Sequence, residues 1–405
     1  MKTNRGVLLG SLAMVGAAII AVGCCSSGVT STTSLANFSA ATKYAYAANE
    51  NSNDISGYTV DNSTGELMEL ATSPFTGPTG PRDAIVEPMG KYLYVSNGGS
   101  NGVSGFAINS ATGALSPIAG SPFAGGAGPR GITVDCCGRY VYTADRGGNS
   151  VSGWVINAGT GALTPISGSP FSLGGGESSF GPQQVTVSPT GRFLYVSNHL
   201  TGDISGFTLA AATGTLTLIS GSPFTDQSEN LGPNIQPFAV VVSPSEKFLY
   251  VTNHGQSTLS VYQIDGMTGA LTAISGSPFD ISLNDEECSA NPFGASISPD
   301  GRFLFVADNG CDAISVFSLD ATTGVPTQTS NSPFFVDAGD CYAGVNEANL
   351  DPSGRFLYVA NMSCGTLSAF SVNAASGDLT ELANSPVNAD NGPYGVAIAR
   401  FPQPQ

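Results

Sequence analysis

The chain has 405 residues, with 13 Lys and Arg against 30 Asp and Glu, so its formal net charge is −17 and its pI is near 4.2. Such a chain repels phosphates, which excludes a nucleic-acid-binding function. Only 11% of the residues are charged and 41% are hydrophobic, with 52 Gly and 25 Pro, which excludes a disordered or a mainly helical chain. The composition predicts a large all-β protein built from short strands and many turns.

The first 23 residues have the pattern of an export signal, because Lys2 and Arg5 precede an uncharged apolar run and small residues. The sequence Ala-Val-Gly-Cys that ends at Cys24 resembles the lipobox of bacterial lipoproteins, whose cysteine is diacylated and becomes the new N-terminus. We predict a signal peptide at 1–23, lipidation of Cys24, and a Ser/Thr-rich tether at 24–42. An ordinary cleaved signal followed by free thiols is the alternative. The protein is then exported to the bacterial cell envelope and contacts the membrane only through this anchor.

One unit of 48 to 55 residues recurs along the chain and ends in Ser-Pro-Phe or Ser-Pro-Val. The serines of these endings are Ser73, Ser121, Ser169, Ser222, Ser277, Ser332 and Ser385. Each unit has the pattern of four strands, with a Pro-x-Gly turn after the first and a Thr/Ser-Gly hairpin before the fourth. Repeated four-stranded units are typical of a β-propeller. We therefore predict one seven-bladed domain at 43–400, a tail at 401–405, and a monomer.

The ends of the repeat series predict how the propeller closes. The first unit begins at its second strand, near Tyr44, whereas residues 393–399 form a first strand with no successors. These two segments are expected to share one blade. Such a junction leaves no exposed sheet edge.

Two repeat positions, called here the entry and the channel position, are predicted to surround the mouth of the central channel on one face, the top face, and a third repeat position, the loop position, lies on the same face. The entry position, at the start of strand one, is occupied by Arg82, Arg130, Gln183, Phe238, Phe293, Asn346 and Tyr394. The channel position, one residue later, is occupied by Asp83, Gly131, Gln184, Ala239, Gly294, Glu347 and Gly395. The loop position, just after strand two, is occupied by Glu50, Gly98, Arg146, His199, His254, Asn309 and Met362. Insertions at 225–236, 280–291 and 335–345 lengthen the loops of this face, where we expect the binding site.

The cations divide between the two faces. Six occupy the Pro-x-Gly turns of the opposite, bottom face, where we predict solvated side chains: Lys91, Arg139, Arg192, Lys247, Arg302 and Arg355. Arg82, Arg130 and Arg146 map to the top face, where they are predicted to bind a carboxylate, a phosphate or a developing oxyanion. Alternatively they pair with Glu50, Asp83 or other loop acids. The two histidines have loop hydrogen bonding as an alternative to a catalytic role.

Two cysteine pairs, Cys288 with Cys311 and Cys341 with Cys364, share a spacing of 23 residues and the same two repeat positions. We predict a structural disulfide within one blade for each pair. Cys136 and Cys137 form either a vicinal disulfide or two free thiols. No zinc site is predicted, because two histidines and no Cys-x-x-Cys offer no tetrahedral ligand set. The acidic stretch 285–287 is predicted to be solvated, with calcium binding as the alternative.

Several motifs carry a family resemblance over residues 43–399. They are Pro-Arg before a strand (Pro81-Arg82, Pro129-Arg130), Pro-x-Gly-Arg/Lys-Phe/Tyr-Leu-Tyr-Val (189–196, 88–95, 352–359), Asn49-Glu50 and the Thr-Gly-x-Leu turns. With these the chain resembles the seven-bladed propeller lactonases, whose type member is the bacterial 6-phosphogluconolactonase, and equally the YVTN-repeat surface propellers. The sequence departs from the family's Pro-Arg-His, because Asp83 and Gly131 replace the histidine.

The resemblance implies lactone ring opening in a top-face pocket without a metal or another cofactor. His199 or His254 would then be the base, with Glu50 as the alternative. Arg82, Arg130 and Arg146 would bind the substrate together with Asp83, Gln183, Asn346 and Glu347. For an exported protein the lactone must be one found outside the cytoplasm. A non-catalytic envelope propeller that binds a protein or a glycan through its top loops is the second hypothesis.

Overall fold

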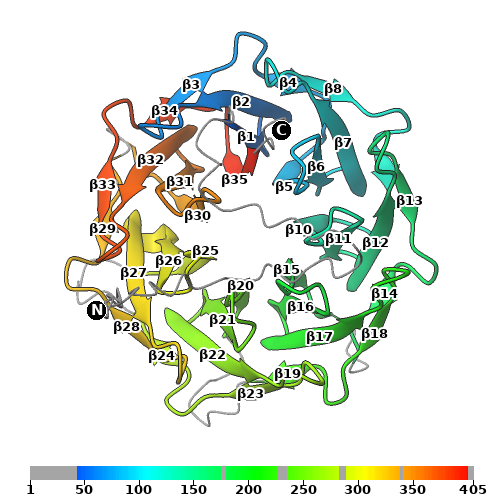
Figure 1. Cartoon of the computed structure of the whole chain (residues 1–405), viewed down its shortest axis with the longest axis vertical. Coiled ribbons are helices and arrows are strands. Elements are labelled where there is room, and N and C mark those ends of the chain that lie inside the picture. Colours follow the sequence, from blue (N-terminus) through cyan, green and yellow to red (C-terminus); the bar gives the residue numbers. More distant parts are fainter. Residues whose placement is uncertain (1–42, 175–178, 226–234, 282–288, 338–340, 400–405) are drawn as a thin grey trace, which may run out of the picture.

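The computed structural model describes residues 43–174, 179–225, 235–281, 289–337 and 341–399. Seven antiparallel sheets surround a central axis and form a seven-bladed β-propeller, as predicted (Figure 1). The predicted signal peptide, Cys24, the tether and the tail lie outside the described residues. None of the described residues belongs to a helix that is long and apolar enough to cross a membrane.

Each blade has three long strands, which follow one another from the central axis to the outside. The innermost strands are β35 (Pro393–Ala399), β5 (Pro81–Val86), β10 (Pro129–Val134), β15 (Pro182–Val187), β20 (Pro237–Val242), β25 (Pro292–Ile297) and β30 (Val345–Leu350). The second strands are β1 (Lys43–Asn49), β6 (Tyr92–Asn97), β11 (Tyr140–Asp145), β16 (Phe193–Asn198), β21 (Phe248–Asn253), β26 (Phe303–Asp308) and β31 (Phe356–Asn361). The third strands are β2 (Asp54–Val60), β7 (Gly102–Ile108), β12 (Ser150–Ile156), β17 (Asp203–Leu209), β22 (Thr258–Ile264), β27 (Ala313–Leu319) and β32 (Thr366–Val372).

The outermost strand differs from the single fourth strand that we predicted, because it consists of two short segments. These segments are β3 (Leu67–Glu69) with β4 (Phe75–Thr76), β8 (Leu115–Pro117) with β9 (Phe123–Ala124), β13 (Leu163–Pro165) with β14 (Phe171–Ser172), β18 (Leu216–Leu218) with β19 (Phe224–Thr225), β23 (Leu271–Ala273) with β24 (Phe279–Asp280), β28 (Pro326–Gln328) with β29 (Phe334–Phe335), and β33 (Leu379–Glu381) with β34 (Val387–Asn388). The Ser-Pro motif lies at the interruption. In every blade the serine hydroxyl accepts a hydrogen bond from the third strand, as Ser73 does from Gly57 N. The hydroxyl thus takes the place of the backbone carbonyl that would accept this N–H in a continuous strand ladder.

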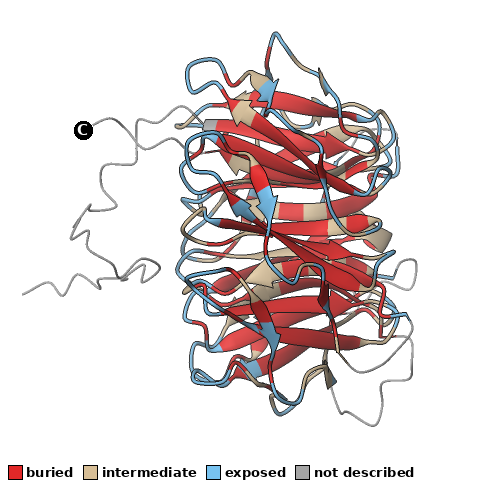
Figure 2. Ribbon diagram, turned by 90° about the vertical axis from the view of Figure 1, so that its right-hand side faces the viewer, coloured by how far each residue is buried: buried red, intermediate tan, exposed pale blue. Residues whose placement is uncertain are grey.

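The predicted closure is confirmed, because β35 pairs antiparallel with β1 and completes the first blade. The second strands are buried on both faces, and the side view shows buried residues throughout the interior with exposed ones at the turns (Figure 2). Each third strand has an aromatic residue at one shared repeat position, and this residue is also part of the core. Trp154, which holds that position in the third blade, is 1% exposed.

Neighbouring blades are joined by a hydrogen bond from a tyrosine in one blade to a hairpin glycine in the next. Tyr195 in β16, for example, donates from its hydroxyl to the carbonyl of Gly269 at 2.8 Å. Six blades make this bond, through Tyr46, Tyr94, Tyr142, Tyr195, Tyr250 and Tyr358. The hairpin glycine has a positive φ, 76° for Gly269, and a Cβ there would overlap the ring of Phe193. The Thr-Gly turn is therefore an interblade contact as well as a hairpin.

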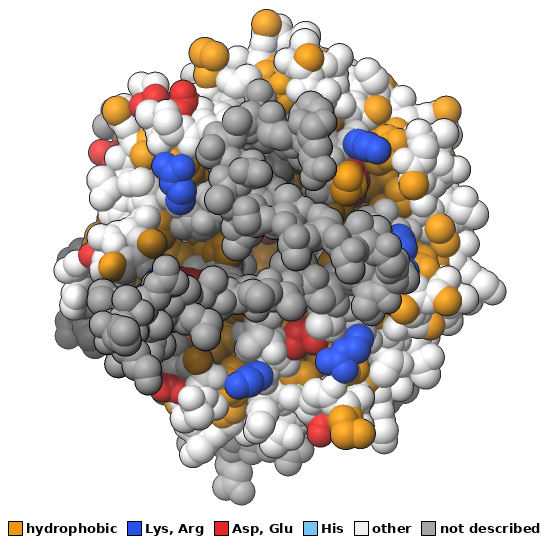
Figure 3. Space-filling view, viewed as in Figure 1, with side chains coloured by type: hydrophobic (Ala, Val, Ile, Leu, Met, Phe, Trp, Pro, Cys, Tyr) orange, Lys and Arg blue, Asp and Glu red, His pale blue; other side chains and the backbone are white. Residues whose placement is uncertain are grey.

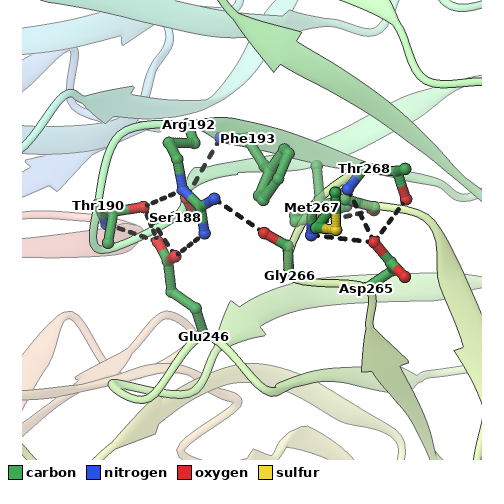
Figure 4. Close-up of polar contacts among 11 residues, drawn as sticks. Ser188, Thr190, Arg192, Phe193, Glu246, Asp265, Gly266, Met267 and Thr268 are labelled. Carbon is green, nitrogen blue, oxygen red and sulfur yellow. Dashed lines mark hydrogen bonds and ion pairs between the residues drawn. The ribbon is translucent and has the colours of Figure 1, made fainter.

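The arginines of the bottom face also connect blades, which corrects the prediction that they are simply solvated. Arg192 lies over the ring of Phe193 and donates to the carbonyl of Gly266 in the next blade at 2.8 Å (Figure 4). It also pairs with Glu246, which accepts from the backbone N and the hydroxyl of Thr190. Arg139, Arg302 and Arg355 make the same stacking and carbonyl contacts. Lys and Arg side chains stand apart from one another around this face (Figure 3).

Replacing Tyr195 with Phe should lower the free energy of unfolding by about 1–3 kcal/mol, because the buried carbonyl of Gly269 loses its donor. The sixth blade offers the reverse change, since its second strand has Phe305 at the tyrosine position. Phe305→Tyr is expected to stabilise the protein by supplying the hydroxyl. Equilibrium denaturation of both variants tests this, and an unchanged stability for Tyr195→Phe would contradict it.

A buried polar position at the end of each second strand includes two carboxyls. Five blades have an asparagine there that donates to a serine seven residues later, as Asn198 does to Ser205 at 2.8 Å. Asp145 instead accepts from three hydroxyls, and burial raises its pKa to about 6. Burial raises the pKa of Asp308 to about 8. Ser315 is the only residue that lowers this pKa. Asp308 is therefore protonated in the folded protein at neutral pH.

Asp308 should make the protein less stable as pH rises from about 4 to about 8, because the carboxyl ionises in the unfolded chain but keeps its proton in the folded one. Asp308→Asn removes this effect. The variant should match the wild type near pH 4 and exceed its unfolding free energy by about 1 kcal/mol or more near pH 8. Denaturation across this pH range measures the difference, with Asp145→Asn as the comparison: because burial raises the pKa of Asp145 only to about 6, its gain should be smaller and complete near pH 6. A pH-independent difference for Asp308→Asn would contradict the assignment.

Candidate functional site

A pocket of about 410 Å³ opens on the top face where the entry positions and the loop positions meet. All seven entry-position residues line it, and so do five loop-position residues: Arg146, His199, His254, Asn309 and Met362. The first strands bring the entry positions together at the axis, and the loops after the second strands surround them. The prediction that the entry positions crowd the channel mouth is therefore confirmed, and we call this cavity the upper pocket.

Three arginines occupy one side of the upper pocket. Arg82, Arg130 and Arg146 come from consecutive blades, and burial together with the charge of Arg130 lowers the pKa of both Arg82 and Arg146. Glu50 forms an ion pair with Arg82, and each side chain is 19% exposed. The pairing with Glu50 that we weighed from the sequence thus holds for Arg82. Among the described residues, Asp83 forms no ion pair with the three arginines. The arginine side of the upper pocket therefore keeps an excess of positive charge.

Tyr394 organises this cluster from the closing strand β35. Its ring lies under the Arg82 guanidinium, 5.0 Å from ring centroid to Cζ, and the positive charges of Arg130 and Arg82 act on its hydroxyl. Gln183 reaches the same hydroxyl with Nε2 at 3.4 Å and accepts from Arg146 Nη1 at 2.7 Å. Burial keeps the pKa of Tyr394 above its usual value despite the arginines. These contacts hold the arginine side chains in one orientation.

The other side of the upper pocket is aromatic. Phe238 and Phe293 pack with ring centroids 4.2 Å apart, and His254 meets the Phe293 ring edge-on at 4.6 Å. His199 stacks against His254 at 6.4 Å. Burial and the nearby Arg146 lower the pKa of His199 to about 4, and burial lowers that of His254. Both imidazoles are neutral at pH 7, and the Nδ1 atom of each is buried without a hydrogen-bond partner.

A second cavity, of about 430 Å³, occupies the central channel beneath the upper pocket. The two cavities share five lining residues: Arg130, Gln183, Phe238, Asn346 and Tyr394. Asp83, Gln184 and Glu347 line only the channel cavity, so the channel positions lie one layer below the arginines. Asn346, which we predicted as a substrate ligand, is 2% exposed and donates to Met362 Sδ at 3.2 Å.

The cysteines agree with the predicted pairing as far as they are described. Cys341 and Cys364 form a disulfide, with Cα atoms 5.9 Å apart. Cys311 is also disulfide-bonded, and its predicted partner Cys288 lies outside the described residues. Cys136 and Cys137 are both in the disulfide state, which decides against free thiols. In the described part of the chain no group of three or more His, Cys, Asp or Glu side chains could hold a metal ion, and the acidic stretch 285–287 lies outside it.

A family comparison now bears on this geometry. The family described as "Lactonase, 7-bladed beta-propeller" matches the chain over residues 35–176, 119–277, 176–333 and 286–393. These overlapping matches cover the repeats almost from end to end. The chain belongs to the seven-bladed propeller lactonase family.

Curated relatives of this family member are named 6-phosphogluconolactonase. The protein from Pectobacterium carotovorum is 25% identical over 219 residues, which are 54% of this chain and 60% of that protein. The one from Serratia proteamaculans is 26% identical over 224 residues, with the same shares. The match thus spans about 60% of the length of these relatives.

Solved structures share the propeller-lactonase fold. A putative 6-phosphogluconolactonase from Bacteroides fragilis has a TM-score of 0.73 at 21% identity, and covers 90% of this chain and 99% of its own. The periplasmic gluconolactonase of Pseudomonas aeruginosa has a TM-score of 0.71 at 20% identity, and covers 89% of this chain and 100% of its own. At these identities the likeness concerns the fold.

Three residues that line the upper pocket were not among the site residues predicted from the sequence. Tyr394, Phe238 and Phe293 stand at the entry position like Arg82 and Arg130, and that shared position was the available signal. Their place at the channel mouth was predicted, but they were not assigned to the binding site. The predicted roles of His199, His254 and Glu50 as bases stay predictions, although the structure brings the two histidines together.

Arg146→Gln should raise the pKa of His199 from about 4 toward its usual value near 6.5, because Arg146 disfavours the imidazolium. The rise should be partial, since burial remains. The chain has only two histidines, so an NMR pH titration resolves both imidazoles, and His254 serves as the internal control. Its pKa is lowered by burial and should stay nearly constant. An unchanged His199 titration would show that the Arg146 charge does not act on this ring.

Proposed function

We propose that this propeller is a metal-independent hydrolase of a lactone that carries a carboxylate or a phosphate. The observation that carries the proposal is the convergence of Arg82, Arg130 and Arg146 around one pocket with a single carboxylate, Glu50, paired to them. Clustered guanidiniums in a partly buried site are suited to bind planar or tetrahedral oxyanions. The names of the curated relatives support a lactone as the substrate.

The reaction fits the charge distribution of the upper pocket. Water adds to the lactone carbonyl and gives a tetrahedral oxyanion, which expels the ring oxygen and leaves a hydroxy acid. Arginines that are already oriented by Tyr394 and Gln183 stabilise the developing charge without reorganising. The aromatic side, formed by Phe238 and Phe293, offers an apolar surface to the face of the substrate ring.

The residues predicted as bases are poorly suited to activate the water. His199 and His254 are neutral at pH 7 and can accept a proton, but a pKa of about 4 makes His199 a weak base. Glu50 is engaged by Arg82. The resemblance to the family points to these residues, whereas their surroundings favour a role in shaping the pocket.

We also propose that the protein acts outside the cytoplasm. The signal pattern at 1–23, the lipobox-like Cys24 and the Cys341–Cys364 disulfide support an oxidising compartment. The Pseudomonas aeruginosa neighbour is named as a periplasmic enzyme. The substrate is then a lactone that occurs in the cell envelope.

Hydrolysis of matched lactones tests the proposed activity. Proton release is followed for phosphorylated, carboxylated and neutral lactones of the same ring size, with the soluble domain from Ser26 onward. The anionic lactones should have the higher kcat/KM, and Arg130→Ala should lower it about 100-fold or more. Treatment with a metal chelator should leave the rate unchanged.

Lys247→Ala is the matched control, because it removes one positive charge from the bottom face. It should retain the wild-type kcat/KM. Equal rates for Arg130→Ala and Lys247→Ala, or no hydrolysis of any lactone by the wild type, would contradict the proposal. Saturable binding of a glycan or protein without turnover would favour the second hypothesis from the sequence.

A further inference from the structure

Two carboxyl groups that the described mechanism does not use face each other in the channel cavity. Asp83 lies on β5 and Glu347 on β30, and the closing strand β35 passes between them. A Cβ placed on Gly395 would lie 2.7 Å from Glu347 Oε2 and 2.9 Å from Asp83 Oδ1. A side chain at position 395 would displace at least one of the two carboxyl groups from this point.

The surroundings of the two carboxyls differ in a way that separates their protonation states. Asp83 accepts hydrogen bonds from Ala84 N at 2.7 Å, Ile132 N at 3.1 Å and Gln184 Nε2 at 3.2 Å. These donors favour its ionised form, so that burial raises its pKa only to about 6. Glu347 Oε2 is buried without a hydrogen-bond partner. Burial and the charge of Asp83 raise the pKa of Glu347 well above its usual value.

The pair is next to the site where the substrate would bind. Arg130 and Tyr394 line both the upper pocket and the channel cavity, and the channel positions begin one residue after the entry positions. A lactone whose anionic group is held by the arginines can direct its ring toward the layer below. One ionised and one protonated carboxyl at such a place are the arrangement of a general base beside a general acid.

We propose that Asp83 is the general base and Glu347 the general acid of lactone hydrolysis, an assignment that rests on the proposed function. Asp83 takes a proton from water while the water oxygen forms a bond to the lactone carbonyl carbon. The tetrahedral intermediate then breaks its bond to the ring oxygen, and Glu347 gives its proton to that oxygen. Transfer of the proton from Asp83 to Glu347 restores both groups, so one water is consumed and no other reactant is needed.

This assignment accounts for a departure from the family pattern. Asp83 stands where Pro-Arg-His would place a histidine, so the position keeps a proton acceptor of a different kind. Its partner Glu347 holds the same repeat position in the seventh unit. The base and acid thus come from blades that adjoin the first blade on either side, with Gly395 of that blade between them.

The test is hydrolysis of the best anionic lactone by the wild type, Asp83→Asn, Glu347→Gln and His199→Ala/His254→Ala. Asp83→Asn and Glu347→Gln should each lower kcat about 100-fold or more with KM within about threefold, because the arginines still bind the substrate. The wild-type rate should rise with pH through about 6, as Asp83 ionises, and this rise should be absent from the residual activity of Asp83→Asn. The double histidine variant should keep it.

Asp308→Asn is the matched control, since it also removes a buried carboxyl but does not line either cavity. It should keep the wild-type rate. A kcat within threefold of the wild type for Asp83→Asn or Glu347→Gln would overturn the assignment. Loss of the pH 6 rise in the double histidine variant but not in Asp83→Asn would assign the base to a histidine. A wild type that hydrolyses no lactone would refute the proposed function itself.

Two further measurements separate chemistry from folding. Gly395→Ala leaves both carboxyls in the sequence but pushes them apart, and it should lower kcat like Glu347→Gln. Infrared difference spectra report the pair without any substrate. At pH 7 the wild type should show a protonated carboxyl that is lost in Glu347→Gln, and a group titrating near pH 6 that is lost in Asp83→Asn. Two ionised carboxylates at pH 7 would overturn the proposal.

Discussion

The contact between adjacent blades is the interaction on which the whole molecule depends. A blade alone has a sheet with two apolar faces, and it becomes stable only when the next blade covers one of them. The tyrosine-to-glycine hydrogen bond sets the register of that contact, because the hydroxyl reaches the carbonyl only when the hairpin lies against the aromatic residue beneath it. The bottom-face arginines repeat the same link at the rim. The distances at the channel mouth follow from this register, since each first strand is positioned by its blade.

The propeller concentrates opposite kinds of polar groups in successive layers of its axis. Positive charge lies at the entry and loop positions, and the carboxyl groups of Asp83 and Glu347 lie one layer below. The shared residues Arg130 and Tyr394 connect the layers. Under the proposed function, a substrate with an anionic group and a reactive carbonyl would meet its binding groups and its acid and base along one line.

The repeat allowed much of this to be predicted from sequence. Alignment on the turn proline placed Arg82, Arg130 and Arg146 together, and the matching end segments indicated closure through residues 393–399. Contacts across the axis could not be predicted, because they join blades distant in the chain and depend on side-chain direction. The approach of Asp83 to Glu347 across Gly395 and the reach of Gln183 to Tyr394 are of this kind. The divided outer strand was missed because the Ser-Pro motif looks like an ordinary turn, whereas its hydroxyl takes the place of a ladder bond.

The closing strand makes the site dependent on completion of the chain. β35 pairs with β1 and also carries Tyr394 and Gly395, the two residues around which the arginines and the carboxyls are arranged. A nascent chain that has formed six blades and all of the first blade except its innermost strand still lacks both. The protein therefore acquires its pocket in the same step that seals its circumference, and a chain shortened before residue 393 would lose the site and the ring closure together. The same strand, β35, thus completes the binding pocket and protects the sheet edge from aggregation.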